Sequence, residues 1–327
     1  MAKLKEKLLF VSILLAAAFV RWSGLNWDQF HHLHPDERHL SMVSTKIRPA
    51  LNFKRYLNPQ TSQLNPYNVG VNSFVYGHFP LNLNKYVGIL ANNDTYDTLT
   101  LQGRFLSGLV DILTVVLIYK LTELFIKKYH WPQATKFWAS LSYALATLPM
   151  QLSHFFAVDT FLSFFMLLSF YFAFKYSQKP NYKNLLLSAL GFSFALASKI
   201  TAFFVLPLNF WFILNAQNRI IKFKHHLKIE LKQLPTVVLN FGIYLLASYL
   251  LIRLIDPYYF AQASWLNPSL HPTLVTTLSF LGGATEKSWY PPAVQWIPTK
   301  PFIFALKNII LVGFGIFSSL YFLIGLG

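Results

Sequence analysis

The residues best suited to chemistry in this chain lie at positions 31–39, which read HHLHPDERH. This stretch follows the first hydrophobic segment and holds two adjacent carboxylates, Asp36 and Glu37, with four histidines and an arginine. A carboxylate can take a proton from a hydroxyl group, which is the task of a general base. Ionisable groups are costly to keep near lipid and commonly mark functional sites there. Asp36 and Glu37 are therefore the first candidates for catalysis.

Asp36 and Glu37 cannot both face one site if they lie on a helix. Adjacent helical side chains point about 100° apart, so one carboxylate can face a substrate while the other holds the loop. Pro35 favours the first turn of a helix, where the helix dipole stabilises acidic side chains. The pair therefore also fits a simple acidic helix start, and the sequence leaves both interpretations open.

A second candidate carboxylate, Asp159, lies in the sequence SHFFAVDT at residues 153–160, at the start of a later hydrophobic segment. By itself it fits an acidic residue that is stabilised by a helix N-terminus. If it lies on the same side of a membrane as Asp36, the two carboxylates become candidates to act on one substrate.

Cations at the same boundary would suit a phosphate group. Four are expected there: Lys85, Arg104, Lys199 and Arg253. Each can simply extend its charge to the membrane interface, which is common for cations at helix ends. Lys199 is the least ordinary, because it interrupts the apolar sequence LASKIT at residues 196–201. A phosphate at the membrane surface would give these cations a partner.

Three further side chains are candidates to position a substrate. They are His34 in the first stretch, and Tyr76 and His78 in the turn-like aromatic segment YGHFPL at residues 76–81. The histidines of the first stretch, together with Asp36 or Glu37, also suggest a divalent metal site. Because no spacing matches a known ligand signature, we expect no metal and no other cofactor to be required.

The composition indicates what must position these residues. The chain has 327 residues, of which 54% are hydrophobic and 12% charged, with a mean hydropathy of +0.40. Soluble domains are about one quarter charged, so this chain reads as an all-α protein with several membrane spans. The net charge of +16 lies mainly between apolar segments, as in cytoplasmic loops, which argues against a nucleic-acid partner. The absence of cysteine excludes disulfides, zinc–thiolate sites and a cysteine nucleophile.

Eight apolar segments are candidate spans: 8–25, 104–126, 135–153, 157–175, 184–199, 200–217, 236–255 and 302–325. The segment 184–217 is long for one span and short for two, since a crossing helix needs about 20 residues. A tight hairpin that turns near Lys199 puts the three most basic loops on one side, as the positive-inside rule requires. We therefore predict two helices there, with an uncleaved first helix and a cytoplasmic N-terminus.

Two long segments, 26–103 and 256–301, then face the extracytoplasmic side. Eight of the twelve acidic residues, Asp36, Glu37 and Asp159 among them, fall on this side or at outer helix ends. The chemistry is therefore expected to be extracytoplasmic, at the cell membrane. We treat residues 1–327 as one transmembrane domain, and we expect that the chain is a C-terminally truncated piece.

The motifs resemble those of the membrane-embedded GT-C glycosyltransferases, in the branch that contains protein O-mannosyltransferases and the bacterial lipid A aminoarabinose transferase. The resemblance covers about residues 8–255, and one motif departs from the family, because His78 and Phe79 replace the first positions of a Pro-Pro-Leu segment. It is carried by the order and spacing of HPDE at 34–37, FPL at 79–81, RFLS at 104–107, HFFAVD at 154–159 and LASK at 196–199.

The resemblance implies a bundle of about eight transmembrane helices with a helical first outer loop. It also implies a hexosyl- or pentosyltransferase that moves a sugar from a polyprenyl-phosphate donor to a hydroxyl group of a protein, lipid or glycan. One carboxylate suffices for displacement with inversion, whereas retention needs a second as nucleophile. We assign the base to Asp36, positioning of acceptor or sugar to Asp159, and loop orientation to Glu37, which can exchange roles with Asp36. The four cations are assigned to the donor phosphate.

Two other classes of function compete with this interpretation. A transporter or flippase of a lipid-linked or anionic molecule would bind its cargo near the membrane midplane, where Asp111 is the candidate ionisable residue. A non-catalytic membrane scaffold predicts no clustering of acidic and basic residues on one face.

Overall fold

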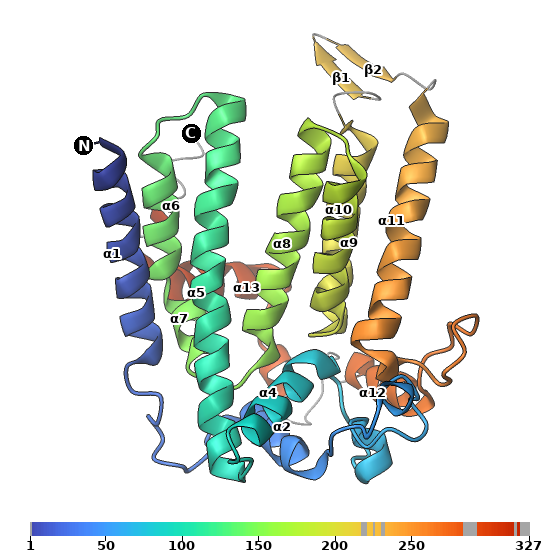
Figure 1. The fold of residues 1–327 in the computed structure, drawn as a ribbon. Helices are drawn as coiled ribbons and strands as arrows, with labels where there is room; N and C mark the ends of the chain where they lie inside the picture. The colour runs from blue at the N-terminus through green and yellow to red at the C-terminus, as the bar shows by residue number, and fades with distance from the viewer. Residues whose placement is uncertain are drawn as a thin grey trace.

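The computed structural model describes residues 2–216, 221–224, 226–229, 233–283, 293–316 and 319–320. Long helices stand side by side, and shorter elements pack across one end of them, the lower end in Figure 1. The N-terminus lies at the opposite end. This arrangement separates a bundle from a cap of irregular and helical segments.

The bundle helices are α1 (Ala2–Trp22), α5 (Tyr96–Tyr129), α6 (Thr135–Ala144), α7 (Thr147–Ser153), α8 (Val158–Gln178), α9 (Tyr182–Leu196), α10 (Leu206–Leu214) and α11 (Leu234–Ile255).

The cap comes mainly from the first outer segment, which is helical as predicted. The helix α2 begins with Pro35 at its first position and has Asp36 and Glu37 in its first turn, where the helix dipole favours both. The cap elements before α5 are α2 (Pro35–Lys46), α3 (Phe53–Tyr56), a 3-10 turn (Pro66–Val69) and α4 (His78–Leu90). Those after α11 include a 3-10 turn (Pro257–Tyr259), α12 (Pro272–Gly283) and a second 3-10 turn (Ala293–Trp296).

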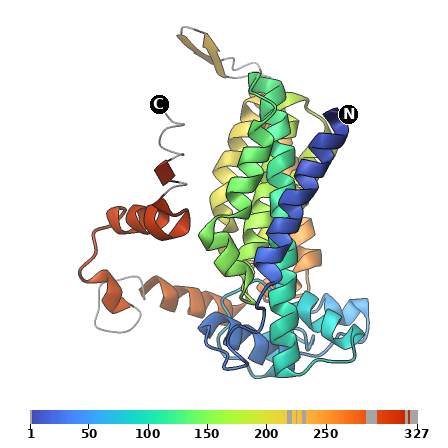
Figure 2. The same cartoon turned by 90° about the vertical axis from the view of Figure 1, so that its left-hand side faces the viewer.

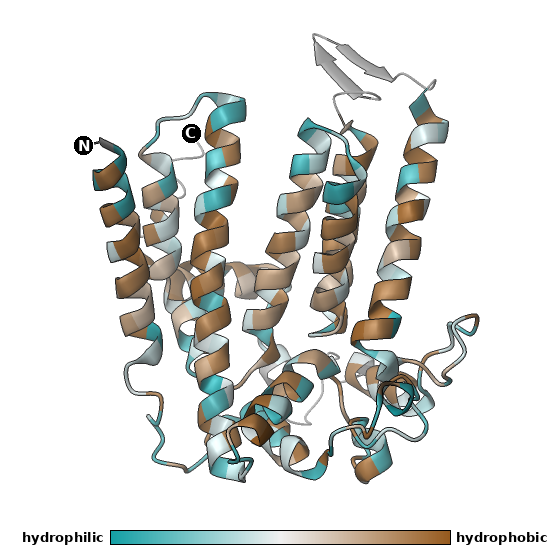
Figure 3. Ribbon diagram, in the orientation of Figure 1, coloured by the Kyte–Doolittle hydropathy of each residue, from teal (hydrophilic) through white to brown (hydrophobic). Residues whose placement is uncertain are grey.

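Two of the described helices, α8 and α11, are long and apolar enough to cross a membrane. The apolar residues of the bundle lie mostly along the middle of its helices, and polar residues gather at their ends and in the cap (Figure 3). The predicted hairpin at 184–217 is confirmed, because α9 ends at Leu196 and a 3-10 helix, Ile200–Val205, leads into α10. A bundle of eight spans stays a prediction.

The described part of the chain is helical as predicted, apart from one short hairpin that we did not expect. Its strands β1 (Ile221–Lys224) and β2 (His226–Ile229) pair antiparallel with Ile221 opposite Ile229. The sequences IKFK and HLKI alternate apolar and basic residues, which favours strands.

Two expected spans are not continuous helices. Leu145 and Ala146 divide the span 135–153 into α6 and α7. The described part of the span 302–325 is interrupted at Phe314 and Gly315, where Gly315 has a φ of +79°. It contains α13 (Ile303–Asn308) and a π-helical turn (Ile309–Gly313). The helix α13 lies across the direction of the bundle helices (Figure 2).

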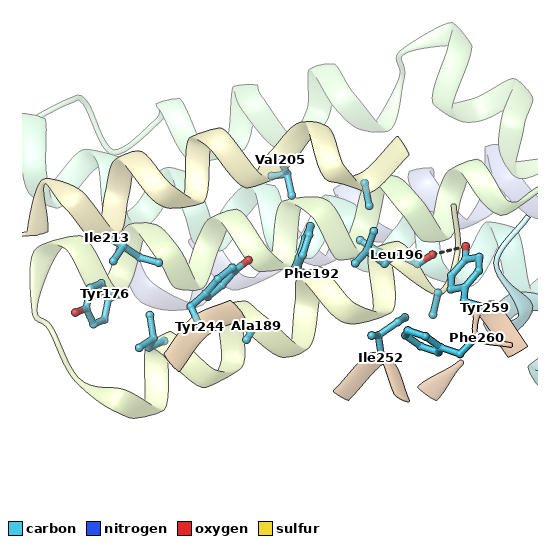
Figure 4. Packing of buried hydrophobic residues seen from close by; sticks show 14 of the residues in the cluster. Tyr176, Ala189, Phe192, Leu196, Val205, Ile213, Tyr244, Ile252, Tyr259 and Phe260 are labelled. Atoms are coloured by element: carbon cyan, nitrogen blue, oxygen red, sulfur yellow. Dashed lines mark hydrogen bonds between the residues drawn. The ribbon is translucent and has the colours of Figure 1, made fainter. Parts of the chain in front are cut away.

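The largest apolar core lies between α8, α9, α10 and α11, and includes the rings of Phe192 and Tyr244 (Figure 4). Small polar residues hold these helices close together. Ser169 and Ser188 exchange hydrogen bonds from hydroxyl to backbone carbonyl at 2.8 and 2.9 Å. A Cβ atom at Gly191 would come within 2.7 Å of the Ser169 nitrogen. Small residues and hydroxyl hydrogen bonds are typical of helix contacts in membranes.

A buried ion pair joins the other half of the bundle. Arg21 of α1 donates from Nε to Asp111 of α5 at 2.5 Å, and both side chains are at most 1% exposed. The hydroxyl of Tyr143 on α6 donates to the other oxygen of Asp111 at 2.6 Å. Asp111, the acid that the sequence placed within a predicted span, is therefore held in a buried ion pair.

Asp111→Ala should strongly destabilise the protein, because it leaves the Arg21 guanidinium buried without its counter-ion. We expect the free energy of unfolding in detergent micelles to fall by about 3–5 kcal/mol. Glu123→Gln is the control, since Glu123 is 31% exposed, pairs with the exposed Lys120 at 3.1 Å, and lies 3.7 Å from Lys136, which also pairs with Glu6. Such a pair contributes less than about 1 kcal/mol. Equal losses in the two variants would contradict the assignment.

Candidate active site

The two adjacent acids at the start of α2 have different surroundings. Glu37 is fully buried, whereas Asp36 is partly exposed. The side chain of His34 accepts a hydrogen bond from the Glu37 nitrogen at 3.3 Å and stacks on the Phe155 ring, with ring centres 4.1 Å apart. His34, predicted to position a substrate, is thus the N-cap of this helix. The expected divergence of the two carboxylates is confirmed.

Glu37 is held by Arg104 of α5. The guanidinium donates from Nε and Nη2 to the two Glu37 oxygens at 2.8 and 2.6 Å. It also donates from Nη1 and Nη2 to Asp28 at 3.1 and 2.7 Å, and from Nη1 to the Leu25 carbonyl at 2.6 Å. Burial alone would raise the pKa of Asp28, but hydrogen bonds and charge from Arg104 outweigh it and lower that pKa. Arg104 is buried and its donors are engaged, so this predicted phosphate ligand is structural.

Glu37 also reaches the segment that leads into α8. Its Oε2 atom accepts a hydrogen bond from the Phe156 nitrogen at 2.7 Å. Phe156 in turn packs on Gly103 of α5, where a Cβ atom would come within 2.2 Å of its ring. One carboxylate therefore fixes the start of α2, one face of α5 and the approach to Asp159.

Tyr76 lies near both Asp36 and Asp159. Its side chain is 8% exposed. Burial, the charge of Asp36 and a hydrogen bond with Asp36, and then the charge of Asp159, raise the pKa of the Tyr76 hydroxyl above its usual value. His39, one turn after Asp36 on α2, lies with its ring centre 6.3 Å from that of Tyr76. Burial lowers the pKa of His39 although the Asp36 charge acts in the opposite direction, so its imidazole is neutral at pH 7.

Lys199 is the cation that joins this group. Its Nζ atom lies 2.9 Å from an oxygen of Asp159, and each side chain is 30% exposed. The backbone just before Lys199 pairs with the segment that carries Tyr76. Gly77 donates to the Ser198 carbonyl at 2.9 Å and Phe79 to the Ala197 carbonyl at 3.0 Å. A Cβ atom at Gly77 would lie 1.9 Å from the Ala197 oxygen, so only glycine fits there.

Two other predicted phosphate ligands are buried in structural contacts. The Lys85 ammonium donates to Asp94 at 2.6 Å, and this hydrogen bond and charge lower the pKa of Asp94. The Arg253 guanidinium lies 3.8 Å from the centre of the Phe260 ring and donates to the carbonyls of Gln262 and Asn267. Lys85 and Arg253 are 1% and 3% exposed. Of the four candidate cations, Lys199 alone is partly exposed.

His78 also lies away from any open site, which corrects its predicted contact with a substrate. It is 1% exposed, and its Nδ1 atom lies 2.7 Å from Asp256, a residue that we did not select from the sequence. Asp256 directly follows α11. The sequence offered one signal for Asp256, its position at a helix end before a proline. This signal does not indicate that His78 is its partner.

The histidines of the first stretch do not converge. His32 lies 2.9 Å from Asp97, His34 caps α2, and His39 lies beside Asp36. Within the described part of the chain, no group of three or more histidine or acidic side chains is placed to hold a metal ion. The expectation that no cofactor is required stays a prediction.

An apolar cavity of about 280 Å³ lies beside the turn that carries Lys199. Leu196 and Ile200, on either side of that turn, contribute to its wall. The rest of the wall comes from α9, α10, α11 and the segment after α11, and the residues that line it are nearly all apolar or aromatic. Figure 4 shows part of this wall, with the Tyr259 hydroxyl bonded to the Leu196 carbonyl.

Residues 97–240 match the protein family described as dolichyl-phosphate-mannose-protein mannosyltransferase. The matched part contains Arg104, Asp159 and Lys199, which belong to three of the motifs on which we based the resemblance. No curated protein sequence matches the chain. The predicted resemblance to the membrane-embedded GT-C glycosyltransferases is confirmed.

Solved structures with the same arrangement support a GT-C-like helical fold. The apo oligosaccharyltransferase of Archaeoglobus fulgidus matches 93% of this chain with a TM-score of 0.53 and 13% identity. The same enzyme in complex with an inhibitory peptide and a dolichol-phosphate matches 96%, with a TM-score of 0.51 and 15% identity. These matches cover 36% and 38% of the archaeal chain, so the present chain spans well under half of its length.

A structure of the S. cerevisiae protein O-mannosyltransferase Pmt1-Pmt2 complex bound to the sugar donor is also similar. The match covers 78% of this chain and 35% of that chain, with a TM-score of 0.48 and 18% identity.

Glu37→Gln and Asp36→Asn should have different effects on stability, although the two positions are neighbours. In Glu37→Gln, the new NH2 group would face a donor of Arg104 in either orientation, and the buried guanidinium would lose one of its two counter-charges. We therefore expect the free energy of unfolding to fall by about 3–5 kcal/mol. Asp36→Asn changes a partly exposed carboxylate and should cost less than about 1 kcal/mol. Thermal unfolding of the purified variants measures both. A Glu37→Gln protein as stable as wild type would show that Glu37 is not structural.

Proposed function

We propose that this chain is a glycosyltransferase that transfers a sugar from a polyprenyl-phosphate donor to an acceptor hydroxyl group, with inversion, on the extracytoplasmic side. One observation carries the proposal: Asp159 pairs with Lys199 at 2.9 Å, and Asp36 and Asp159 both lie near enough to Tyr76 to act on its hydroxyl group, although these residues come from α2, the segment before α4, α8 and the turn after α9. A base, a positioning carboxylate and a cation are the groups that such a transfer needs.

In the proposed reaction the acceptor oxygen forms a bond to the anomeric carbon of the donor, and the bond from that carbon to the phosphate oxygen breaks. Asp36 takes the proton of the acceptor hydroxyl group, and the electron pair of the broken bond leaves with the polyprenyl phosphate. Lys199 stabilises the charge that the leaving phosphate gains. The buried state of Glu37, which is bound to Arg104 through both oxygens, supports Asp36 as the base.

The donor lipid suits the apolar cavity beside Lys199. A polyprenyl chain is a hydrocarbon, and ligand cavities that bury such groups are lined mainly by apolar and aromatic side chains. With the lipid in that cavity, the phosphate would lie at the turn that carries Lys199. The Asp159 carboxylate, which faces Lys199 at 2.9 Å, would then border the sugar.

The proposed side of the membrane follows from the position of the charges. The cap that contains α2 and α4 lies at one end of the bundle, and the N-terminus and the basic hairpin β1–β2 lie at the other (Figure 1). Basic loops face the cytoplasm, so the cap would face outward. We also propose that the protein crosses the cell membrane several times. Residues 1–327 would form one domain, whose segments 26–103 and 256–301 face outward.

Asp36→Asn should reduce transfer from a labelled polyprenyl-phosphate sugar by about 10²–10⁴-fold, because the amide cannot accept the hydroxyl proton. The matched control is Asp97→Asn, which changes an outer acid that is 55% exposed and paired with His32; it should leave transfer unchanged. The assay compares equal amounts of folded protein in proteoliposomes with a mixture of hydroxyl acceptors. Full transfer by Asp36→Asn would rule out Asp36 as the base.

Lys199→Gln should lower the rate by about 10²–10³-fold, the loss typical of removing one group that stabilises developing negative charge. Lys199→Arg keeps the cation and should retain more of the rate. Lys46→Gln, at the exposed end of α2, is the control for the loss of an outer lysine. If Lys199→Gln and Lys46→Gln transfer sugar equally fast, Lys199 does not bind the leaving phosphate.

A further inference from the structure

The short segment after α11 holds several parts of the cap. The carboxylate of Asp256 binds the start of α4, and the hydroxyl of Tyr258 lies 2.9 Å from that of Ser62 in the first outer segment. The Tyr259 hydroxyl donates to the Leu196 carbonyl at the end of α9 at 2.8 Å. Asp256, Tyr258 and Tyr259 thus contact the start of α4, the segment at Ser62 and the end of α9, all of which are distant from them in the sequence.

Asp256 supplies the cap that α4 lacks. The N-cap position of α4 is Gly77, which has no side chain to accept a hydrogen bond. Asp256 accepts from the His78 nitrogen through Oδ2 at 2.8 Å and lies 2.7 Å from His78 Nδ1 through Oδ1. It is fully buried. A negative charge at a helix N-terminus is favourable, so this carboxylate fixes where α4 begins.

The His78 ring makes the attachment rigid. Its Nδ1 atom faces the Asp256 carboxylate at 2.7 Å, so the tautomer with a proton on Nδ1 can donate to it. Its Nε2 atom is buried and has no hydrogen-bond partner in the described part of the chain. The rings of Phe74, Tyr258 and Tyr259 surround it, with ring centres 5.1 to 5.7 Å away.

The start of α4 is also the place where the proposed site is assembled. Tyr76, which contacts Asp36, comes two residues before His78. Gly77 and Phe79 donate to the Ser198 and Ala197 carbonyls, directly before Lys199. A shift of the α4 start would therefore move the tyrosine and the lysine relative to the two site carboxylates.

We infer that Asp256 is a positioning residue that sets the geometry of Tyr76 and Lys199 through the N-terminus of α4 and His78. The inference rests on the proposed function for its effect on transfer, but the attachment itself is independent of that function. Asp256 does not touch the proposed substrate site, so its effect must pass through the residues that it holds.

Asp256→Ala should lower kcat by about 10²-fold at equal amounts of folded protein, because a shift of about 1 Å in a reacting group costs that much. Loss of this buried carboxylate should also lower stability, so the folded fraction is measured first. Asp256→Asn keeps an acceptor for the His78 backbone nitrogen, and its amide can donate to Nδ1 of the other His78 tautomer. It should therefore restore kcat to within about fivefold of wild type, the equivalent of one weakened hydrogen bond. Failure of asparagine to restore the rate, at equal folded protein, would contradict a positioning role.

A double-mutant cycle tests whether Asp256 acts through Lys199. If it does, Asp256→Ala combined with Lys199→Gln should lose clearly less rate than the product of the two single losses, because coupled residues are non-additive. Tyr258 lies in the same segment as Asp256, and Tyr258→Phe removes its hydrogen bond to Ser62. The rate loss of this control should multiply with that of Lys199→Gln. A loss equal to the product of the single losses of Asp256→Ala and Lys199→Gln would overturn the inference.

Hydrogen exchange gives a readout that does not depend on transfer. In Asp256→Ala, the amides of Gly77, His78 and Phe79 should exchange faster, and those of α2 should not change. Unchanged exchange at 77–79 would overturn the inference even if the enzyme is active. Equal transfer by wild type, Asp36→Asn and Lys199→Gln would instead refute the proposed function and leave the exchange result to decide on Asp256.

Discussion

The arrangement of the cap depends on one buried interaction, the contact of Arg104 with Glu37 and Asp28. All three side chains are at most 4% exposed. Removing charges from water costs several kcal/mol for each ion, and only complete hydrogen bonding offsets this. The guanidinium satisfies the condition, because it binds Glu37 at two points and Asp28 at two more. Such an interaction tolerates little displacement of α2 against α5.

This constraint explains why two neighbouring acids can have different tasks. Because Glu37 is fixed against α5, the helical geometry turns Asp36 about 100° away from it, toward Tyr76. The bond from Glu37 to the Phe156 nitrogen fixes the other side of the site, three residues before Asp159. The buried cluster thus sets the distance between the two carboxylates without taking part in the proposed reaction.

The sequence predicted those features that depend on local pattern. The turn at Lys199 followed from the charge of the loops, and the separation of Asp36 from Glu37 followed from helical periodicity. It did not reveal which cations are already paired. Arg104 meets Glu37 across 67 positions, and His78 meets Asp256 across 178. No local pattern encodes such distant pairs, so a structural cation and a ligand-binding cation look the same in the sequence.

The structure divides the outer charges into two groups with different energetics. Arg104 is buried and has two carboxylates, whereas Lys199 and Asp159 form a single pair with each side chain 30% exposed. An exposed pair contributes only about 0–1 kcal/mol, so a phosphate can displace it at small cost. In the proposed transfer the donor phosphodiester carries one negative charge and the released polyprenyl phosphate carries up to two. Lys199 would therefore bind the leaving group more strongly than the donor, which is the condition for a cation to speed the reaction rather than only hold the substrate.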